Sequence, residues 1–272
     1  MATVEGLTAA IDQVIAFFNA RKMDLPDSFF DVVVHKRVNG DWVKEGQYHE
    51  STGSYVPVRW HREHPDKMLW ADNRETQTKA LFWVNMKTGE REAVYHHPKV
   101  EISDVDWNQD DEAIGAWHDY DYSTYVPLKP ERRDVKEYQK LAAAFPDHLV
   151  RVTSTTDDGL ESLAVVSNDQ DPGKVYLYNH YDGKVRFLLD PRPDIDAKKM
   201  PRMHAVRYKA RDGMELVAYL TVPVHKPMKN LPLIVLPHGG PHGPRDYWGV
   251  NPEAATFANA RYLFGRTEYE AW

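Results

Sequence analysis

The sequence repeats itself with a period of 47 residues, and this repeat constrains the fold more than any other feature. Trp60, Trp107 and Ser154 stand 47 residues apart, and a polar turn follows each of them. In every copy a short strand-like segment leads up to the marked residue, and another follows the turn. Such a period is typical of units that cannot bury their own faces and therefore stack against neighbouring copies.

A second pair of turns keeps the same phase. Gly89 follows Trp60 by 29 residues, and Gly183 follows Ser154 by 29 residues. The turn dipeptides are Thr-Gly and Asp-Gly, whose glycine supplies the positive φ that tight hairpins need. Each unit is therefore predicted to hold four short antiparallel strands, which is the construction of a β-propeller blade. The alternative is a β-sandwich with coincidental spacing.

An earlier copy and an insertion complete this part of the chain. The earlier copy comprises residues 14–21 and a hairpin about Asn39 and Gly40. The insertion, residues 127–146, interrupts the third unit, and its apolar residues follow helical spacing. We therefore expect a partial propeller of about four blades over residues 1–190, with a short helix added to one of them.

The pattern changes after this repeat. Residues 191–203 are rich in proline and charge and are predicted to be a linker. An alternating hairpin about Asp212 and Gly213 follows. Residues 233–236, Leu-Ile-Val-Leu, are apolar without alternation, as in a strand covered on both faces, and they lead into a glycine-rich turn. Residues 252–259 read as a helix with proline at its first position.

Two of these runs resemble a known family. Residues 207–223 and 231–259 resemble the start of the catalytic α/β-hydrolase domain of the prolyl oligopeptidase family, in its dipeptidyl-aminopeptidase and acylaminoacyl-peptidase-like branch. Residues 169–200 are similar to that family's last propeller blade and interdomain linker. The resemblance implies a mostly β chain: a partial β-propeller followed by the truncated start of an α/β-hydrolase domain at residues 204–272.

The resemblance also implies a chemistry. Members are serine peptidases that act on short peptides by acyl transfer through Ser, Asp and His, without metal or organic cofactor, beneath a propeller that filters access. None of the eight serines of this chain stands in a GxSxG setting, and all precede the hydrolase-like segment. No triad member can therefore be assigned. The resemblance places His238, Gly239 and Gly240 at the border of the active site, on its oxyanion side, although His-Gly-Gly alone is equally typical of a surface turn.

The expected function follows from this comparison of motifs. We expect a fragment of a serine peptidase that is inactive alone, with peptide substrates belonging to the parent enzyme. The alternative is a non-enzymatic propeller-like binding module with a short α/β tail. About four blades cannot close a ring of seven or eight, so we expect exposed edges and self-association. From residue 260 onward the sequence departs from the family's pattern.

The composition argues against several other classes of partner and site. The formal net charge is −7 and there is no basic stripe, so nucleic acid is not an expected partner. The chain has no cysteine, which excludes disulfides and thiolate metal sites and leaves the cytosol and the periplasm equally open. No apolar run is long enough for a membrane span, and we expect a soluble chain. Whether residue 1 is the native start is left open.

Two patterns imitate metal sites. The pairs His61 with His64 and His238 with His242 cannot share a helical face, so no metal is expected there. The run from Asp104 to Asp110 imitates a calcium loop, but the sixth and twelfth positions hold glutamine and glycine instead of glycine and glutamate. A solvated turn between strands is the prediction for this run.

Overall fold

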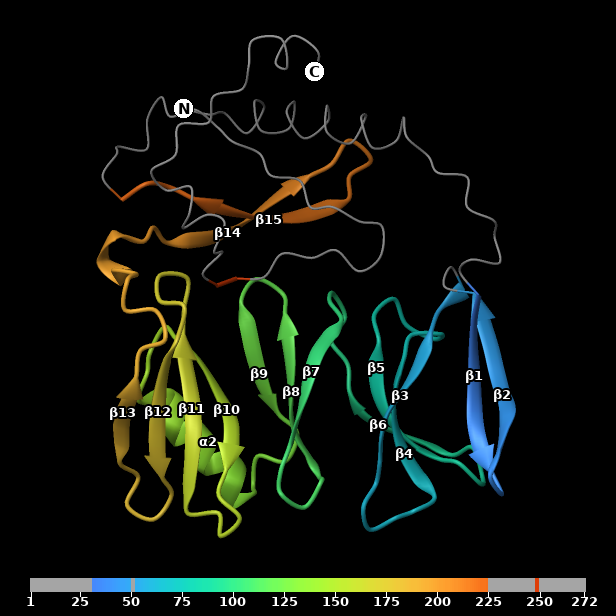
Figure 1. The fold of residues 1–272 in the computed structure, drawn as a ribbon. Coiled ribbons are helices and arrows are strands. Elements are labelled where there is room, and N and C mark those ends of the chain that lie inside the picture. Colours follow the sequence, from blue (N-terminus) through green and yellow to red (C-terminus); the bar gives the residue numbers. More distant parts are fainter. Residues whose placement is uncertain (1–30, 50–51, 225–247, 250–272) are drawn as a thin grey trace. The chain divides into compact units, whose positions relative to one another are not determined.

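The computed structural model describes residues 31–49, 52–224 and 248–249, and nearly all of its regular structure is β (Figure 1). The described residues divide into two compact units on either side of the bond between Lys136 and Glu137. Every strand pairing within the described ranges is antiparallel. The predicted mostly β fold is confirmed.

The first unit holds three sheets, each built from strands that follow one another in the chain. The two-stranded sheet is β1 (Asp31–Val38) with β2 (Asp41–His49). The four-stranded sheet is β3 (Tyr55–Trp60), β4 (Lys67–Asp72), β5 (Ala80–Asn85) and β6 (Arg91–Tyr95). The three-stranded sheet is β7 (Ile102–Trp107), β8 (Ala113–Asp119) and β9 (Ser123–Pro127).

The second unit begins within helix α2 (Arg133–Ala143), which lies inside the segment predicted to be helical. A four-stranded sheet follows, of β10 (Leu149–Thr155), β11 (Glu161–Ser167), β12 (Lys174–Asn179) and β13 (Val185–Leu189). A short 3₁₀ helix, η3 (Ala197–Lys199), precedes the hairpin of β14 (Met203–Lys209) and β15 (Glu215–Thr221).

Each of the three marked copies of the sequence repeat corresponds to one β-sheet of the structure. Trp60 and Trp107 end β3 and β7, and Ser154 is the penultimate residue of β10, so each marks the first strand of a sheet. The two four-stranded sheets have their strands in chain order, which is the connectivity of a propeller blade. The sheet of the Trp107 unit has three strands where four were predicted, because after β9 the chain continues into helix α2. The predicted strands at residues 14–21 and 233–236 and the predicted helix from residue 252 lie outside the described residues.

Two hairpin turns that lie 94 residues apart, which is two repeats, are closed by the same hydrogen bonds. The backbone N–H of Gly89 donates to the carbonyl of Asn85 at 2.8 Å, and that of Gly183 donates to the carbonyl of Asn179 at 2.9 Å. Both glycines have positive φ, 76° and 69°. Each asparagine also accepts two N–H groups of the turn on its side-chain oxygen. These local bonds explain why the turns were recognisable in the sequence.

The turns after the first strands repeat as well, but with two different acceptors. Asn108 Oδ1 accepts the backbone N–H groups of Asp110 and Glu112, both at 2.9 Å. At the position one repeat earlier, His61 Nδ1 accepts those of Glu63 and His64 at 3.2 and 3.3 Å. An imidazole nitrogen can accept these bonds only while it is unprotonated. The turn at His61 therefore depends on the protonation state of one ring, and the turn at Asn108 does not.

Each unit has a core of its own. In the first unit Leu69 and Leu81, from the four-stranded sheet, pack with Ala113 and Ala116 of β8, and all four are at most 4% exposed. The ring of Tyr125 lies so close to Gly115 that a Cβ there would stand 2.0 Å from its Cε2. Gly115 thus leaves room for the ring of Tyr125 on the neighbouring strand β9, and the small side chains of Ala113 and Ala116 let the two sheets approach each other.

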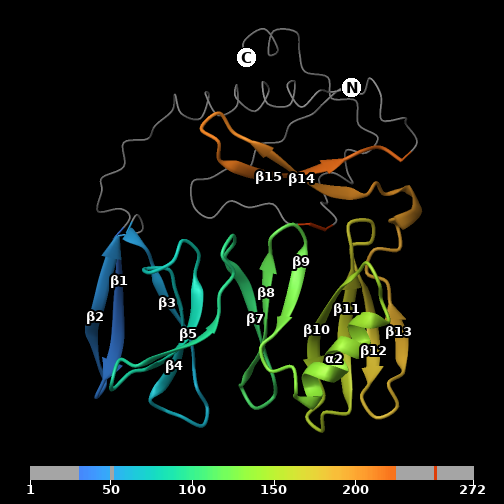
Figure 2. The same ribbon diagram turned by 180° about the vertical axis from the view of Figure 1, so that it is seen from behind.

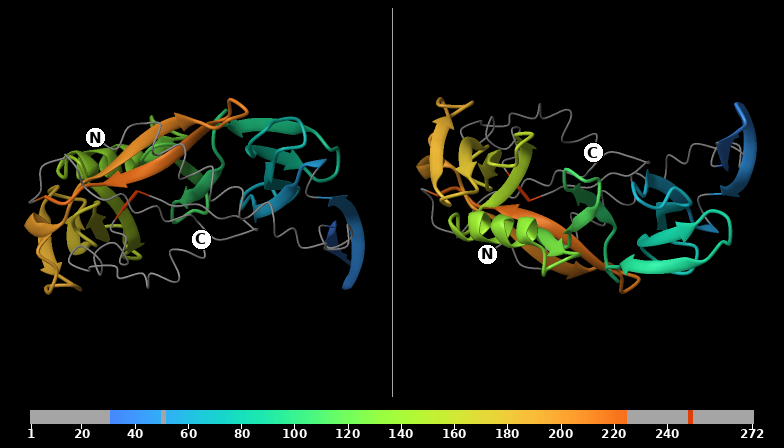
Figure 3. Two further views of the ribbon diagram at one scale, coloured as in Figure 1. Left: turned by 90° about the horizontal axis from the view of Figure 1, so that it is seen from above. Right: turned by 90° about the horizontal axis from the view of Figure 1, so that it is seen from below.

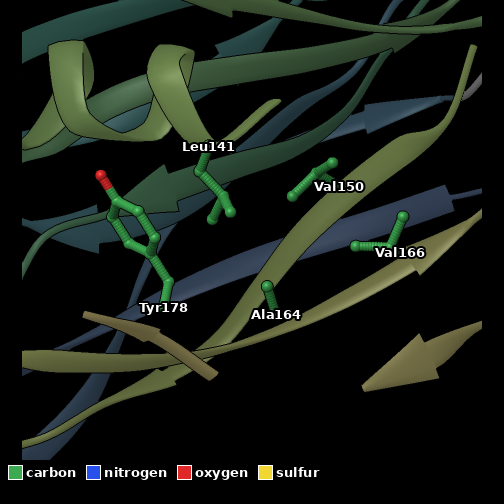
Figure 4. Packing of buried hydrophobic residues seen from close by; sticks show 5 residues of the cluster. All are labelled: Leu141, Val150, Ala164, Val166 and Tyr178. Carbon is green, nitrogen blue, oxygen red and sulfur yellow. The ribbon is translucent and has the colours of Figure 1, made fainter. Parts of the chain in front are cut away.

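In the second unit α2 covers one face of the β10–β13 sheet (Figure 2). Leu141 of the helix meets Val150, Ala164, Val166 and Tyr178 of the sheet, and all five are at most 3% exposed (Figure 4). In β11 the buried residues alternate with half-buried ones, as expected for a strand with one face beneath the helix. The helix therefore supplies the apolar cover that this sheet requires.

We predict that His61→Asn weakens the dependence of stability on pH. Burial, together with the neighbouring His64, lowers the pKa of His61, so the folded state favours the neutral ring. That contribution to stability is complete above the unfolded pKa, about 6.5, and is lost as the pH falls through the lower folded pKa. Asparagine retains the acceptor, as Asn108 does, but does not titrate.

Chemical unfolding of both proteins at pH 7 and at successively lower pH checks this. The wild type should lose more free energy of unfolding than the variant over that range. His35→Asn, in the exposed strand β1, is the matched control and should behave as the wild type. Identical pH profiles for wild type and His61→Asn would contradict the prediction.

Candidate functional site

The residues that the sequence places at the active-site border, His238, Gly239 and Gly240, lie outside the described residues. The structure does describe the hairpin β14–β15 that leads to them, a long two-stranded ribbon (Figure 3). Within it Val206 stands opposite Ala218 and Tyr208 opposite Leu216. The hairpin about Asp212 and Gly213 that the alternating sequence predicted is confirmed, and the structure supplies its register. The described candidate region is therefore this hairpin and its attachment to the last sheet.

A buried carboxylate makes the attachment. Asp169 is 4% exposed, and its Oδ2 accepts the backbone N–H of Met203, the first residue of β14, at 2.6 Å. The guanidinium of Arg202 lies 3.5 Å from the other oxygen. Beside it, the side-chain amide of Gln170 donates to the carbonyl of Met200 at 2.7 Å. Bonds to a buried charged group are stronger than bonds between neutral groups, so this contact can hold the start of the hairpin.

The loop that presents Asp169 has a local cause. After β11, Asn168 Oδ1 accepts the backbone N–H groups of Gln170 and Asp171, both at 2.8 Å. Asn168 is itself only 6% exposed. We call residues 168–173 the anchoring loop, because they connect β11 to β12 and bind residues 200–203. Sequence analysis assigned no role to Asp169; its position in a short polar stretch between two strands was the only available signal.

Charge also ties together the two ends of the β12–β13 hairpin. The ammonium of Lys174, the first residue of β12, binds Asp171 of the anchoring loop and lies 3.8 Å from Asp190, which follows β13. The hydrogen bond that Lys174 donates to Asp171 is the main cause that raises the pKa of Lys174. The anchoring loop is thus held on one side by the linker and on the other by the strand that it precedes.

One serine of the described residues meets a histidine. Ser162 Oγ lies 2.7 Å from His180 Nε2 and 2.8 Å from the Oγ1 of Thr155. A nucleophilic serine must be exposed on a strained turn, whereas Ser162 is 2% exposed and is the second residue of the regular strand β11. The pair therefore serves packing within the sheet.

The metal-like patterns have other partners in the structure. The ring of His61 lies 4.7 Å from that of His64, but its Nδ1 accepts backbone N–H groups. In the run that imitates a calcium loop, Asp111 binds Arg59 at 2.7 Å and Asp110 lies 3.7 Å from Arg62. Among the described residues no group of three or more His, Asp or Glu side chains is placed to hold a metal ion.

A membrane-spanning helix would need a long apolar stretch. Within residues 31–49, 52–224 and 248–249, no helix is both long and apolar enough to cross a bilayer.

Comparison with known proteins finds relatives among peptidases. Dipeptidyl aminopeptidase BIII of Pseudoxanthomonas mexicana is 29% identical over 206 residues, which are 72% of this chain and 29% of that protein. Dipeptidyl peptidase family member 6 of Caenorhabditis elegans is 25% identical over 199 residues, 64% of this chain and 26% of that protein. The chain spans less than a third of the length of these curated relatives.

Solved structures show a weaker likeness. A puromycin-hydrolyzing peptidase of Mycobacterium tuberculosis matches 82% of this chain and 34% of its own, with a TM-score of 0.48 and 17% identity. No protein-family profile matches the chain.

We predict that Asp169→Asn loosens the attachment of the hairpin. The variant loses the charge that faces Arg202 and weakens the bond to the N–H of Met203, at an expected cost of about 1–3 kcal/mol in the free energy of unfolding. Hydrogen exchange at the amide of Met203 should become faster. Denaturant unfolding and exchange monitored by mass spectrometry measure both effects.

Asp157→Asn, in the exposed turn between β10 and β11, is the matched control and should change neither quantity. Unchanged protection at Met203 in Asp169→Asn would show that the carboxylate does not hold the hairpin.

Proposed function

We propose that this chain forms propeller blades and the connection between two domains in an enzyme that cleaves short peptides. The premise is that the part of the chain that its relatives match belongs to the prolyl oligopeptidase family of serine peptidases. The observation behind the proposal is the 29% identity to a dipeptidyl aminopeptidase over 206 residues, which extends across most of this chain. Blade-like sheets followed by a hairpin and a buried-strand sequence ending in His-Gly-Gly appear in the order that the family requires.

The proposal includes three domain boundaries. Residues 1–190 form the partial propeller, residues 191–203 the linker, and residues 204–272 the beginning of the hydrolase domain. In support, β13 ends at Leu189, and the only regular element described between it and β14 is η3. The anchoring loop would then belong to the last blade and hold the first strand of the next domain.

The proposed chemistry is acyl transfer through a serine that this chain does not contain. Such chemistry needs a serine on a strained turn, an acid, and a histidine, and none of the eight serines has that setting. The turn at His238, Gly239 and Gly240 would border the oxyanion side of the active site, where backbone N–H groups stabilise developing negative charge. We therefore expect the chain by itself to be inactive.

A peptidase assay tests the proposal in two arms. The purified chain is incubated with chromogenic dipeptidyl amides and aminoacyl esters, and it should release no chromophore above the rate of a heat-denatured sample. The same assay is applied to the product of the coding sequence extended past residue 272, which should cleave the dipeptidyl amides and be inhibited by a serine-directed fluorophosphonate.

Turnover by the chain alone that persists through further purification would contradict its predicted inactivity. An extension without a GxSxG serine would contradict the peptidase proposal and favour the non-enzymatic binding module instead.

We also propose that the chain self-associates through β13, the outer strand of the four-stranded sheet β10–β13. In the described residues β13 pairs with β12 on one side only, and its Phe187 and Leu189 are 52% and 49% exposed. An apolar edge strand is a template for pairing with another chain. Phe187→Lys should lower the mean mass measured by light scattering after size exclusion.

Leu160→Lys replaces an equally exposed leucine, 50%, in the turn between β10 and β11, and should leave that mass unchanged. A monomeric wild type across the concentration range would rule out this association.

A further inference from the structure

A cavity of about 360 Å³ lies between α2 and the hairpin of β12 and β13. Its walls include Glu137 and Lys140 of the helix and Tyr178 and Tyr181 of the hairpin. All of its lining residues belong to the second unit. Its volume is within the range of roughly 300–1,000 Å³ that is usual for small-ligand sites. Neither the blade repeat nor the proposed peptidase chemistry accounts for its charged wall.

The wall holds a fixed carboxylate. The side chain of Glu137 is 13% exposed, and its Oε2 accepts the hydroxyl of Tyr178 at 2.8 Å. Burial and the neighbouring Glu137 raise the pKa of Tyr178 to about 12, so the phenol stays protonated and keeps donating. Figure 4 shows the phenol oxygen of Tyr178 directed towards the helix. The negative charge is thus held at one place in the cavity.

A cation that pairs with this carboxylate, Lys140, is easily displaced. Lys140 Nζ lies 2.8 Å from Glu137 Oε1, but the lysine side chain is 68% exposed. An ion pair with a mobile, solvated lysine contributes little, because water and salt screen it and the long side chain loses rotamer freedom. A cation that enters the cavity from solution can therefore replace Lys140 while the lysine returns to water.

The remaining walls suit a flat cation on an apolar stem. The rings of Tyr178 and His180 lie edge to face with their centroids 4.8 Å apart, and Tyr181 stands 89% exposed beside them. Aromatic faces attract cations, and they stack best on guanidinium. Ala144 and Val185 provide an apolar wall. A planar guanidinium can pair with the carboxylate and stack on the rings, whereas an ammonium group lacks the planar shape for stacking.

We propose that this cavity binds a guanidinium ligand of the arginine type, with its guanidinium on Glu137 in place of Lys140 and its alkyl stem against the apolar wall. Within the described residues the geometry joins a held carboxylate, adjoining aromatic rings and a volume that admits one side chain. The site does not depend on peptidase activity, so it can be tested whether or not the proposed function is correct.

The test is calorimetric titration of the purified chain with N-acetyl-arginine amide and with its citrulline counterpart, which has the same shape without the charge. The arginine compound should bind at least tenfold more tightly. Glu137→Gln, which retains an acceptor for Tyr178, should weaken that binding at least tenfold. Lys140→Met should strengthen it several-fold, because the competing cation is removed; a purely structural lysine would not have this effect.

Glu161→Gln is the matched control, since Glu161 lies on the same sheet outside the cavity. Agmatine, a guanidinium without a peptide-like backbone, separates two ligand sources: weaker binding of agmatine points to arginine within peptides, and equal binding points to the guanidinium and stem alone. Equal affinity for the citrulline compound, or no binding at millimolar concentration, overturns the proposal. Should Glu137→Gln fail to fold, Lys140→Met decides, and unchanged or weaker binding overturns it.

Discussion

The covering of apolar sheet faces is the constraint on which the rest of this structure depends. A small antiparallel sheet has two faces and cannot bury both by itself. In the first unit the four-stranded sheet finds its cover in β8, where Ala113 and Ala116 are small enough to admit Leu69 and Leu81. In the second unit the cover is α2, whose Leu141 occupies the centre of the sheet. The inserted helix is thus part of the core, and it also forms one wall of the cavity.

Turn chemistry is the second organising element. Several of the described turns close on a side chain that accepts backbone N–H groups, and asparagine does so at positions 85, 108, 168 and 179. His61 takes the same place one repeat before Asn108. Either side chain can occupy this position, because the acceptor atom is bonded to Cγ in both asparagine and histidine. Only the imidazole makes the turn sensitive to pH.

The attachment of the β14–β15 hairpin joins fold to proposed function. If the hairpin begins the hydrolase domain, the bond between Asp169 and the N–H of Met203 fixes where that domain leaves the last blade. A buried carboxylate is suited to this role, because removing its partner leaves an unsatisfied charge at considerable cost. The likeness to a dipeptidyl aminopeptidase covers 72% of this chain, which spans less than a third of the length of that relative.

The sequence by itself determined the local features: the 47-residue period, the hairpins, including the one about Asp212 and Gly213, and the helix within residues 127–146. These follow from alternation, glycine at positive φ and helical spacing, which involve near neighbours. Tertiary structure alone decided that Asp169 meets Met203 and that Tyr178, 41 residues away, holds Glu137. No local pattern marks such pairs, because each depends on how separate elements pack and on which polar groups that packing leaves to satisfy one another.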